Sequence, residues 1–350
     1  MAIKDASEHS ILNSERDSFD AVREVASLFL SREISPEGLR NISRVSEGFS
    51  GGAVYRCSTT VGEFAVKRWP LPSKPERIAE VHAVQRFAAE SLAMIPPLMT
   101  DAFGKTSIVV RNAYYECSRW MPGQAANDED ADNISWAENI RRGAVAIADF
   151  HHRTADRGVQ TDIAPSVTQR LTRLAELQTC LPDAIARRGQ LTGSIRIAAE
   201  YLARNSHTLH RDAVVALQPW SRRPVELQWV LRDVHREHVL FASGEVTGIV
   251  DFDALKRDTI ALDLARWVGS FTYRATGPRP WDVAMVGYES RRRILPCERE
   301  LAGELGQANR FINLANWVVW VAGESRQFPG GIAAVNKRVA DLLRKVDVRI

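Results

Sequence analysis

The hydrophobic pattern changes once along the chain, near residue 120, and this change limits the possible folds. Between Ile42 and Arg119, short runs rich in β-branched and aromatic residues alternate with turn residues, and one helical pattern interrupts them. After Trp120-Met121-Pro122-Gly123 most patterns have helical spacing, and a single β-hairpin is expected within residues 239–253. The sequence therefore predicts an α+β protein with two lobes, a small antiparallel sheet with one helix and a larger, mainly helical part.

Three regions follow from these patterns. Residues 1–40 are expected to form an N-terminal extension with a peripheral helix, because apolar residues recur at helical spacing from Phe19 to Phe29. Residues 41–122 are expected to form the N-lobe, and residues 123–350 the C-lobe.

The composition does not indicate a nucleic-acid or membrane partner. The formal net charge is only +3 and the basic residues are scattered, whereas a surface that follows nucleic-acid phosphates needs clustered charge. The polar N-terminal segment lacks the apolar core of a signal peptide, and the longest apolar stretches are too short to span a bilayer. The four cysteines lie far apart, without a metal-binding or disulfide pattern. We expect a cytoplasmic protein, and the sequence does not specify its oligomeric state.

A glycine-rich segment lies between the first two predicted strands of the N-lobe. Backbone N–H groups can approach phosphate oxygens closely where side chains are small, so this segment is a candidate phosphate cover. Its candidate residues are Gly48, Ser50, Gly51 and Gly52. The segment does not have the G-x-G-x-x-G spacing, and an ordinary glycine-rich hairpin turn is the alternative interpretation.

A lysine at the end of the next strand strengthens the phosphate interpretation. The segment Phe64-Ala65-Val66-Lys67 ends where kinases carry V-A-I-K, whose lysine contacts nucleotide phosphates; an exposed strand-end lysine is the alternative. The ion-pair partner of Lys67 should come from the following helix, and we choose Glu80 because it shares a helix side with apolar residues. Glu76 and His82 are the competing candidates.

The segment Leu231–Phe241, LRDVHREHVLF, carries the strongest chemical signal. Asp233 follows Arg232 as in the kinase pattern H-R-D-x-x-x-x-N, and His238 occupies the position of the asparagine. The predicted hairpin then places Asp251, in the segment IVDFD, where a kinase carries its metal-binding aspartate. A surface loop carboxylate paired with Arg232 or Arg236 is the alternative for Asp233.

This segment resembles the aminoglycoside phosphotransferase and choline kinase-like family, whose signature reads roughly HGDLHPGNVLF, then IIDFD, then a DLA element. The similarity is specific over Gln228–Ser270 and looser over Ile42–Gly123. It implies a bilobal protein-kinase-like fold, a nucleotide-binding N-lobe, and a C-lobe that carries catalytic and acceptor-binding residues. It also implies ATP or GTP as phosphoryl donor, with Mg²⁺ or Mn²⁺.

The resemblance also implies residue roles. Lys67 would bind the nucleotide phosphates, Asp233 would orient the acceptor hydroxyl, and Asp251 would hold metal. Trp120 and Met121 would form the hinge beside the adenine. Asp263, the aspartate of the DLA element, is expected to orient the catalytic loop.

Two departures from the family signature affect this interpretation. Leu231 replaces a histidine that braces the loop, and an apolar packing residue can substitute for it. His238 replaces an asparagine, and an imidazole nitrogen suits manganese or zinc better than magnesium. His238 therefore either ligates metal with an altered preference, or leaves the metal to Asp251 and Asp253, or marks a protein that binds nucleotide without transfer.

We favour an active small-molecule kinase because the other key positions of the pattern are present. The acceptor would be a hydroxyl on an aminoglycoside, sugar, amino alcohol or similar small molecule, often cationic in this family. The acidic segment 128–132 could bind such a cation, and a solvated helix cap is its alternative interpretation. Trp267, Tyr273 and Trp281 could line an apolar pocket, but we expect them in the helical core.

Two other classes of function stay open. One is a catalytically impaired, nucleotide-binding pseudokinase with a regulatory role. The other is a protein kinase, which fits less well because Asp253 stands in place of the D-F-G glycine and no A-P-E element follows.

Overall fold

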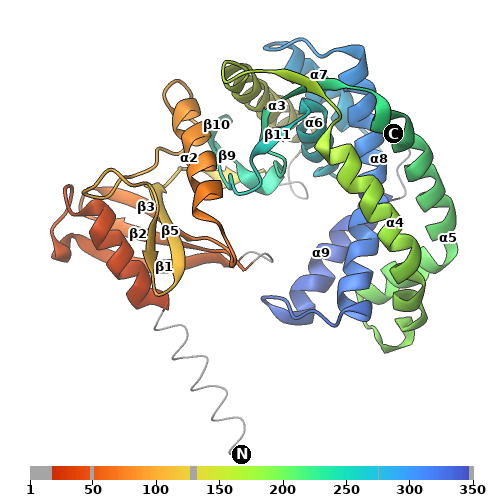
Figure 1. Ribbon diagram of the computed structural model, residues 1–350, viewed down its shortest axis with the longest axis horizontal. Coiled ribbons are helices and arrows are strands. Elements are labelled where there is room, and N and C mark those ends of the chain that lie inside the picture. The colour runs from red at the N-terminus through yellow and green to blue at the C-terminus, as the bar shows by residue number, and fades with distance from the viewer. Residues whose placement is uncertain (1–17, 48–50, 127–131, 275, 347–350) are drawn as a thin grey trace, which may run out of the picture. The chain divides into compact units, whose positions relative to one another are not determined.

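The computed structural model describes residues 18–47, 51–126, 132–274 and 276–346. The chain divides into two compact units, Met1–Met121 and Pro122–Ile350. Figure 1 shows a β-sheet with helices in the first unit and mainly helices in the second. The α+β class predicted from the sequence is confirmed.

The N-terminal unit contains a five-stranded antiparallel sheet with the strand order β1-β2-β3-β5-β4. The strands are β1 (Leu39–Glu47), β2 (Ala53–Thr59), β3 (Gly62–Arg68), β4 (Ile108–Val110) and β5 (Ala113–Arg119). The helix α2 (Pro75–Ala89) lies between β3 and β4 in the chain, as the sequence predicts. The short 3-10 turn η1 (Pro36–Gly38) precedes β1.

A helix at residues 18–30 is part of the core of this unit and not peripheral. Its apolar side is buried against sheet residues that include Tyr55, Phe64 and Tyr115. Alternate residues of β2, β3 and β5 face this helix, so the other residues of these strands point to the opposite face. The prediction of a peripheral helix was wrong because helical spacing reveals an apolar side but not the surface that covers it.

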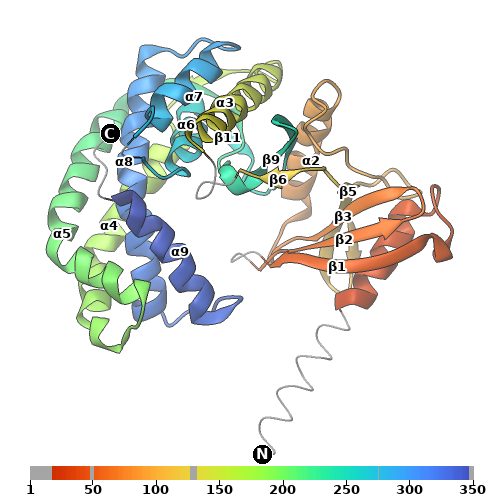
Figure 2. The ribbon, with the colours of Figure 1, turned by 180° about the vertical axis from the view of Figure 1, so that it is seen from behind.

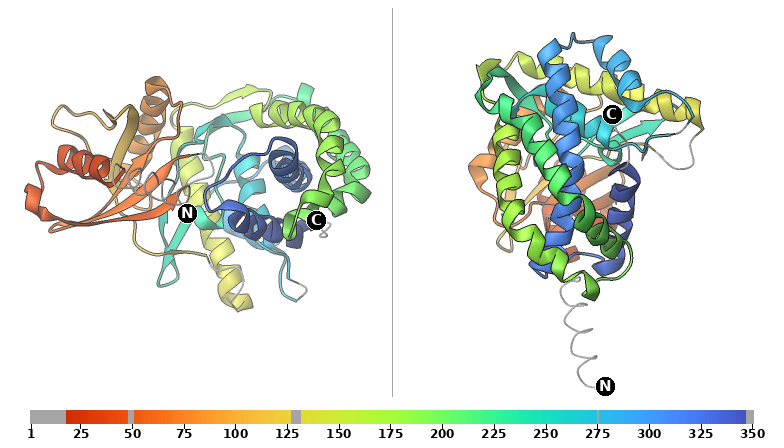
Figure 3. Two further views of the ribbon diagram at one scale, coloured as in Figure 1. Left: turned by 90° about the horizontal axis from the view of Figure 1, so that it is seen from below. Right: turned by 90° about the vertical axis from the view of Figure 1, so that its right-hand side faces the viewer.

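The C-terminal unit is built on long helices. They are α3 (Asn133–Ala155), α4 (Pro165–Ala186), α5 (Ser194–Leu217), α6 (Ile260–Gly269), α7 (Pro280–Glu289), α8 (Pro296–Val318) and α9 (Gly331–Val346). Helix α5 packs against α4, α8 and α9, which Figure 3 shows from two further directions. Helix α9 also packs on α8 (Figure 2). Short 3-10 turns follow α4 and α5, namely η2 (Arg188–Gln190) and η3 (Gln218–Arg222), and the π-helical turn η5 (Val319–Gly323) ends α8.

Two small sheets lie in the same unit and position the loops described below. Their strand orders are β10-β9-β6 and β11-β8-β7. The strands are β6 (Gln124–Ala125), β7 (Gln160–Asp162), β8 (Val225–Val230), β9 (Val239–Ala242), β10 (Glu245–Ile249) and β11 (Lys256–Asp258). Strands β9 and β10 are the predicted hairpin.

Gly123 permits the close approach of β6 to β9. Its φ is +104°, and a Cβ atom there would lie 2.6 Å from Thr247 Oγ1 and 2.7 Å from the Phe241 carbonyl oxygen. A side chain at this position would separate the two strands.

Within the described ranges, the helices all fall short of the length and apolar character that a bilayer crossing requires.

Candidate active site

The segment between β8 and β9 forms a tight loop that ends in the 3-10 turn η4 (Arg236–His238). Arg232 has a φ of +65°, and Asp251, after β10, has a φ of +67°. Residues other than glycine adopt this left-handed conformation at a cost, and such residues cluster at functional sites. Leu231 is only 2% exposed, so it packs in the interior as expected for a replacement of the family histidine.

Asp263 holds the backbone of this loop in place. The carboxylate is fully buried and accepts hydrogen bonds from the N–H groups of Leu231 at 2.7 Å and Arg232 at 2.6 Å. Its Oδ2 also contacts Nε2 of His151 at 2.9 Å. The expected role of Asp263 in orienting the loop is confirmed by these contacts.

The hydrogen-bond chain continues behind Asp263. Nδ1 of His151 lies 2.8 Å from the Tyr288 hydroxyl. Burial lowers the pKa of His151, so the ring is neutral. The ring donates a hydrogen bond from Nε2–H to the Asp263 carboxylate and accepts one at Nδ1 from the Tyr288 hydroxyl. The loop thus rests on a buried polar network whose partners come from three helices, α3, α6 and α7.

Asp233 follows the braced residues, and its side chain is 39% exposed. It forms an ion pair with Arg266 of α6, a residue that the sequence analysis did not identify. Arg232 pairs instead with the buried carboxylate of Asp258, at 3.3 Å. The alternative of a carboxylate paired with its neighbour Arg232 therefore does not describe this loop.

His238 and Asp251 lie together beside Asp233. Nδ1 of His238 is 2.8 Å from the backbone oxygen of Asp233 and must donate to it, since a carbonyl oxygen only accepts. In the neutral ring Nε2 then carries the lone pair, and this atom lies 3.6 Å from Oδ2 of Asp251. The backbone also links these segments, because the Val250 N–H donates to the His238 carbonyl oxygen at 2.9 Å.

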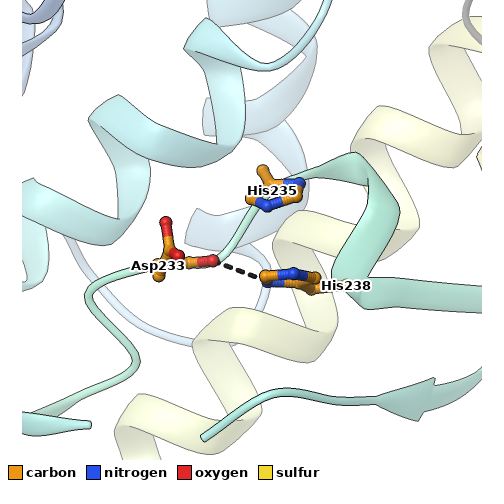
Figure 4. A group of neighbouring side chains, drawn as sticks. All are labelled: Asp233, His235 and His238. Carbon is orange, nitrogen blue, oxygen red and sulfur yellow. Dashed lines mark hydrogen bonds between the residues drawn. The ribbon is translucent and has the colours of Figure 1, made fainter. Parts of the chain in front are cut away.

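His235 is a further candidate ligand that the sequence analysis missed. Its ring lies 3.7 Å from that of His238, centroid to centroid. One potential ligand atom from each of Asp233, His235 and His238 lies within 4.8 Å of the others (Figure 4). Burial, followed by the neighbouring His238 and Arg338, lowers the pKa of His235 to about 2, so its ring is neutral. The run H-R-E-H in the sequence was a signal for this pair.

The donor set fits a divalent cation. A histidine ligates metal as the neutral ring, and its second nitrogen is usually held by a hydrogen bond, as Nδ1 of His238 is held here. Together with the Asp251 carboxylate this gives mixed nitrogen and oxygen donors, which suit manganese better than magnesium.

In the N-terminal unit, Lys67 lies on β3 opposite Glu116 of β5. Residues paired across antiparallel strands point to the same face, so the two side chains share the face opposite to the helix at residues 18–30. Oε2 of Glu116 lies 2.6 Å from Trp69 Nε1 and 2.7 Å from His82 Nε2. Burial alone would raise the pKa of Glu116, but the hydrogen bond with His82 and the charge of Lys67 outweigh it and lower the pKa.

Strand pairing places the carboxylate of Glu116 opposite Lys67, whereas Glu80 lies on an exposed part of α2. Glu80 is 48% exposed and forms an ion pair with Arg77 at 2.8 Å, and Glu76 is also exposed. The buried side of α2 follows Ile78, Val81, His82, Val84, Gln85 and Ala88, and Glu80 lies outside it. The competitor His82 is the residue by which α2 reaches this site.

The other predicted nucleotide residues are placed as follows. Gly48 and Ser50 lie outside the described residues. Gly51 has a φ of +86° and Gly52 directly precedes β2, so both end the predicted turn. Trp120 and Met121 directly follow β5, and the Trp120 ring lies 4.8 Å from the Arg56 guanidinium carbon.

The predicted acceptor residues divide into two groups. Trp267 is fully buried and donates Nε1–H to the Ile140 carbonyl oxygen at 3.0 Å, as expected for a core residue. Tyr273 and Trp281 instead line a pocket, so their assignment to the core was wrong. Asp132, the described end of the acidic segment, caps α3 by accepting from backbone N–H groups, which agrees with the solvated-cap interpretation.

Known proteins share the sequence pattern and the fold. The profile of the phosphotransferase enzyme family matches residues 41–301. The chain is 30% identical over 123 residues to the homoserine kinase of Gluconacetobacter diazotrophicus, a match covering 33% of this chain and 35% of that protein. The match thus spans about a third of the length of this relative.

Two solved structures illustrate the shared kinase-like fold. An aminoglycoside phosphotransferase from Alicyclobacillus acidocaldarius has a TM-score of 0.59 and 16% identity, over 88% of this chain and 90% of that chain. An amicoumacin kinase in complex with AMP-PNP and Ca²⁺ has a TM-score of 0.62 and 11% identity, over 95% of each chain. At sequence identities this low, the similarity shows a shared fold.

Proposed function

The chain belongs to the phosphotransferase enzyme family, and from this premise we propose that it transfers the γ-phosphoryl group of ATP, or of GTP, to a hydroxyl of a small molecule. The observation that carries the proposal is the buried brace of Asp263 on the loop that presents Asp233. A carboxylate that orients an attacking hydroxyl must be held in a fixed position, because phosphoryl transfer depends mainly on positioning and electrostatics.

The roles of the residues follow from their chemistry. Lys67 would bind phosphate oxygens of the nucleotide, and Glu116 would orient its ammonium group. Asp251 and His238 would hold a divalent cation, with His235 as a further donor. When bound, such a cation would neutralise charge on the phosphate oxygens.

The proposed transfer forms one bond to phosphorus, breaks another and releases one proton. The acceptor oxygen forms a bond to the γ-phosphorus while the bond from that phosphorus to the bridging oxygen breaks, and the nucleoside diphosphate leaves. The hydroxyl proton passes to Asp233 and then to water. Asp233 orients the hydroxyl through a carboxylate oxygen, while Arg266 holds the other side of the carboxylate group.

A transfer assay over chemically different acceptors tests this function. Purified protein would be given ATP or GTP, magnesium or manganese, and one acceptor at a time from homoserine, sugars, amino alcohols, nucleosides and aminoglycosides. We expect acceptor-dependent formation of the nucleoside diphosphate together with a phosphorylated acceptor.

Asp233→Asn should reduce the transfer rate by at least about 100-fold and leave nucleotide binding nearly unchanged. The matched control is Asp156→Asn, which changes an exposed aspartate at the end of α3. Nucleotide binding without transfer to any acceptor would instead support the pseudokinase. Equal activity of Asp233→Asn and the control would reject the assigned role of Asp233.

A further inference from the structure

A pocket lies beside the candidate catalytic loop, within the C-terminal unit. Residues of η4, α6, α8 and α9 line it. His235 of this lining is two residues from Asp233, and Arg266 of the lining is the ion-pair partner of Asp233. The position of the pocket beside Asp233 therefore fits the acceptor of the proposed transfer.

Positive charge predominates in this lining. The cationic side chains are Arg236, Arg266, Arg310, Arg338 and Lys345. The carboxylates in the lining are those of Glu237 and Asp341, and both already contact cations. Asp341 accepts from Arg236 at 3.3 Å and from Lys345 at 3.0 Å. Glu237 accepts from Arg338 at 3.4 Å.

Burial and nearby positive charge act on arginines of this lining. Burial, followed by the charges of Arg338 and Arg232, lowers the pKa of Arg266 to about 10. Burial also lowers the pKa of Arg310. Nε of Arg266 is buried without a hydrogen-bond acceptor among the described residues. An anion in the pocket would relieve this repulsion and could accept from these guanidinium groups.

A mainly apolar pocket shares part of the same lining. Ala265, Gly269, Gly306, Arg310 and Lys345 belong to both pockets, so the two are neighbours. The aromatic and apolar part of the second pocket comes from Phe271, Tyr273, Pro280 and Trp281. Cationic side chains therefore lie beside the loop, and apolar side chains lie next to them.

We propose that the acceptor is an alcohol carrying a carboxylate or phosphate group, which the arginine and lysine side chains of this pocket bind beside Asp233. This inference rests on the proposed phosphoryl transfer and names its acceptor class. A polycationic aminoglycoside would meet like charge in this pocket, so the family's frequent preference for cationic acceptors does not fit this lining.

Matched pairs of acceptors test the charge directly. Each pair keeps the reacting hydroxyl and changes only the anionic group: homoserine and homoserinol, glycerate and glycerol, a sugar phosphate and the free sugar. An aminoglycoside serves as the cationic arm. For the acceptor pair that the enzyme phosphorylates, we expect kcat/KM to be at least about tenfold higher for the anionic member than for the uncharged member. The uncharged member lacks the charge-assisted contact with the pocket. The preferred pair distinguishes a carboxylate from a phosphate.

Variants identify the residues responsible. Arg310→Gln should raise KM for the anionic acceptor at least about tenfold and change KM for its uncharged partner little. Arg310→Lys keeps the charge and should restore part of the affinity, which separates charge from packing. Arg196→Gln is the control, because this arginine lies on α5 and pairs with Glu200 at 3.0 Å on the surface.

A binding measurement separates this inference from the proposed function. Calorimetric titration of the wild type and of Arg310→Gln with inorganic phosphate, and with the hydroxy acids, needs no nucleotide and no turnover. Anion binding that Arg310→Gln weakens, in a protein without transferase activity, would support the anion site and reject the transfer. Transfer that prefers the uncharged or cationic acceptors, with no anion binding, would reject the anion site and leave the transfer standing.

Discussion

Replacement of Asp263 by asparagine tests the structural basis of the loop. The buried carboxylate accepts hydrogen bonds from Leu231 N at 2.7 Å, Arg232 N at 2.6 Å and His151 Nε2 at 2.9 Å. Asparagine has nearly the same shape, but one oxygen becomes an NH₂ group that must face a donor. At least one hydrogen bond to a charged group is lost, and such a bond contributes about 1.5 to 3 kcal/mol.

We therefore expect Asp263→Asn to lower the free energy of unfolding by about 2 to 3 kcal/mol. Because Asp233 directly follows Arg232, release of the loop should also lower kcat by at least about tenfold, with a smaller effect on KM for the nucleotide. Urea-induced unfolding followed by circular dichroism gives the first quantity, and steady-state transfer kinetics give the second.

Asp156→Asn makes the same chemical change at an exposed position and should alter stability by no more than about 0.5 kcal/mol. The reasoning is refuted if Asp263→Asn unfolds at the same urea concentration as this control and keeps the kcat of the wild type. A loss of stability with unchanged kcat would show that Asp263 stabilises the core but does not position Asp233 for transfer.

Three further predictions concern other parts of the site. Glu116→Gln should raise KM for ATP about tenfold, because the negative charge facing Lys67 is lost, while Glu80→Gln should leave this KM unchanged. Equal effects of the two variants in steady-state kinetics would favour Glu80 as the ion-pair partner of Lys67. His238→Asn should shift the preference of the transfer reaction from manganese toward magnesium, and an unchanged ratio of the two activities would exclude His238 as a ligand. Burial lowers the pKa of His151 below its usual value of 6.5. As the pH falls below 6.5, this histidine is therefore protonated in the unfolded chain but not in the folded chain, and the folded protein loses stability. Unfolding of His151→Gln at a series of pH values should show a smaller loss, by up to about 1.4 kcal/mol per pH unit, and an identical slope would contradict the neutral buried ring.

The fold class and the hairpin that follows Asp233 could be predicted because their signals are local. The change from strand to helix spacing identifies an α+β chain, and a hairpin between Asp233 and Asp251 constrains where each carboxylate lies. The role of Asp263 followed from the family resemblance, and its contacts with the loop agree with it.

The partner of Lys67 could not be found in the same way, because it depends on strand register and helix phase together. Glu116 stands opposite Lys67 only after β3 and β5 pair, 49 positions apart in the chain. A shift of two residues along α2 separates the exposed Glu80 from the buried His82. A charged residue between buried neighbours in the strand AYYECSR was the available signal.

The positive charge of the pocket beside η4 could not be predicted from the sequence either. Its cations come from α6, α8, α9 and the loop, and only tertiary packing brings them together. Single arginines in helices are usually solvated, so no local pattern distinguishes Arg310 from an exposed arginine such as Arg196.

The most direct test of the central claim, that this loop forms the metal and phosphate end of an active site, is anomalous diffraction from crystals grown with AMP-PNP and Mn²⁺. We expect a manganese peak bonded to a carboxylate oxygen of Asp251 and to Nε2 of His238, at about 2.0 to 2.3 Å. A nucleotide bound with its manganese beyond coordination distance of both residues would contradict it.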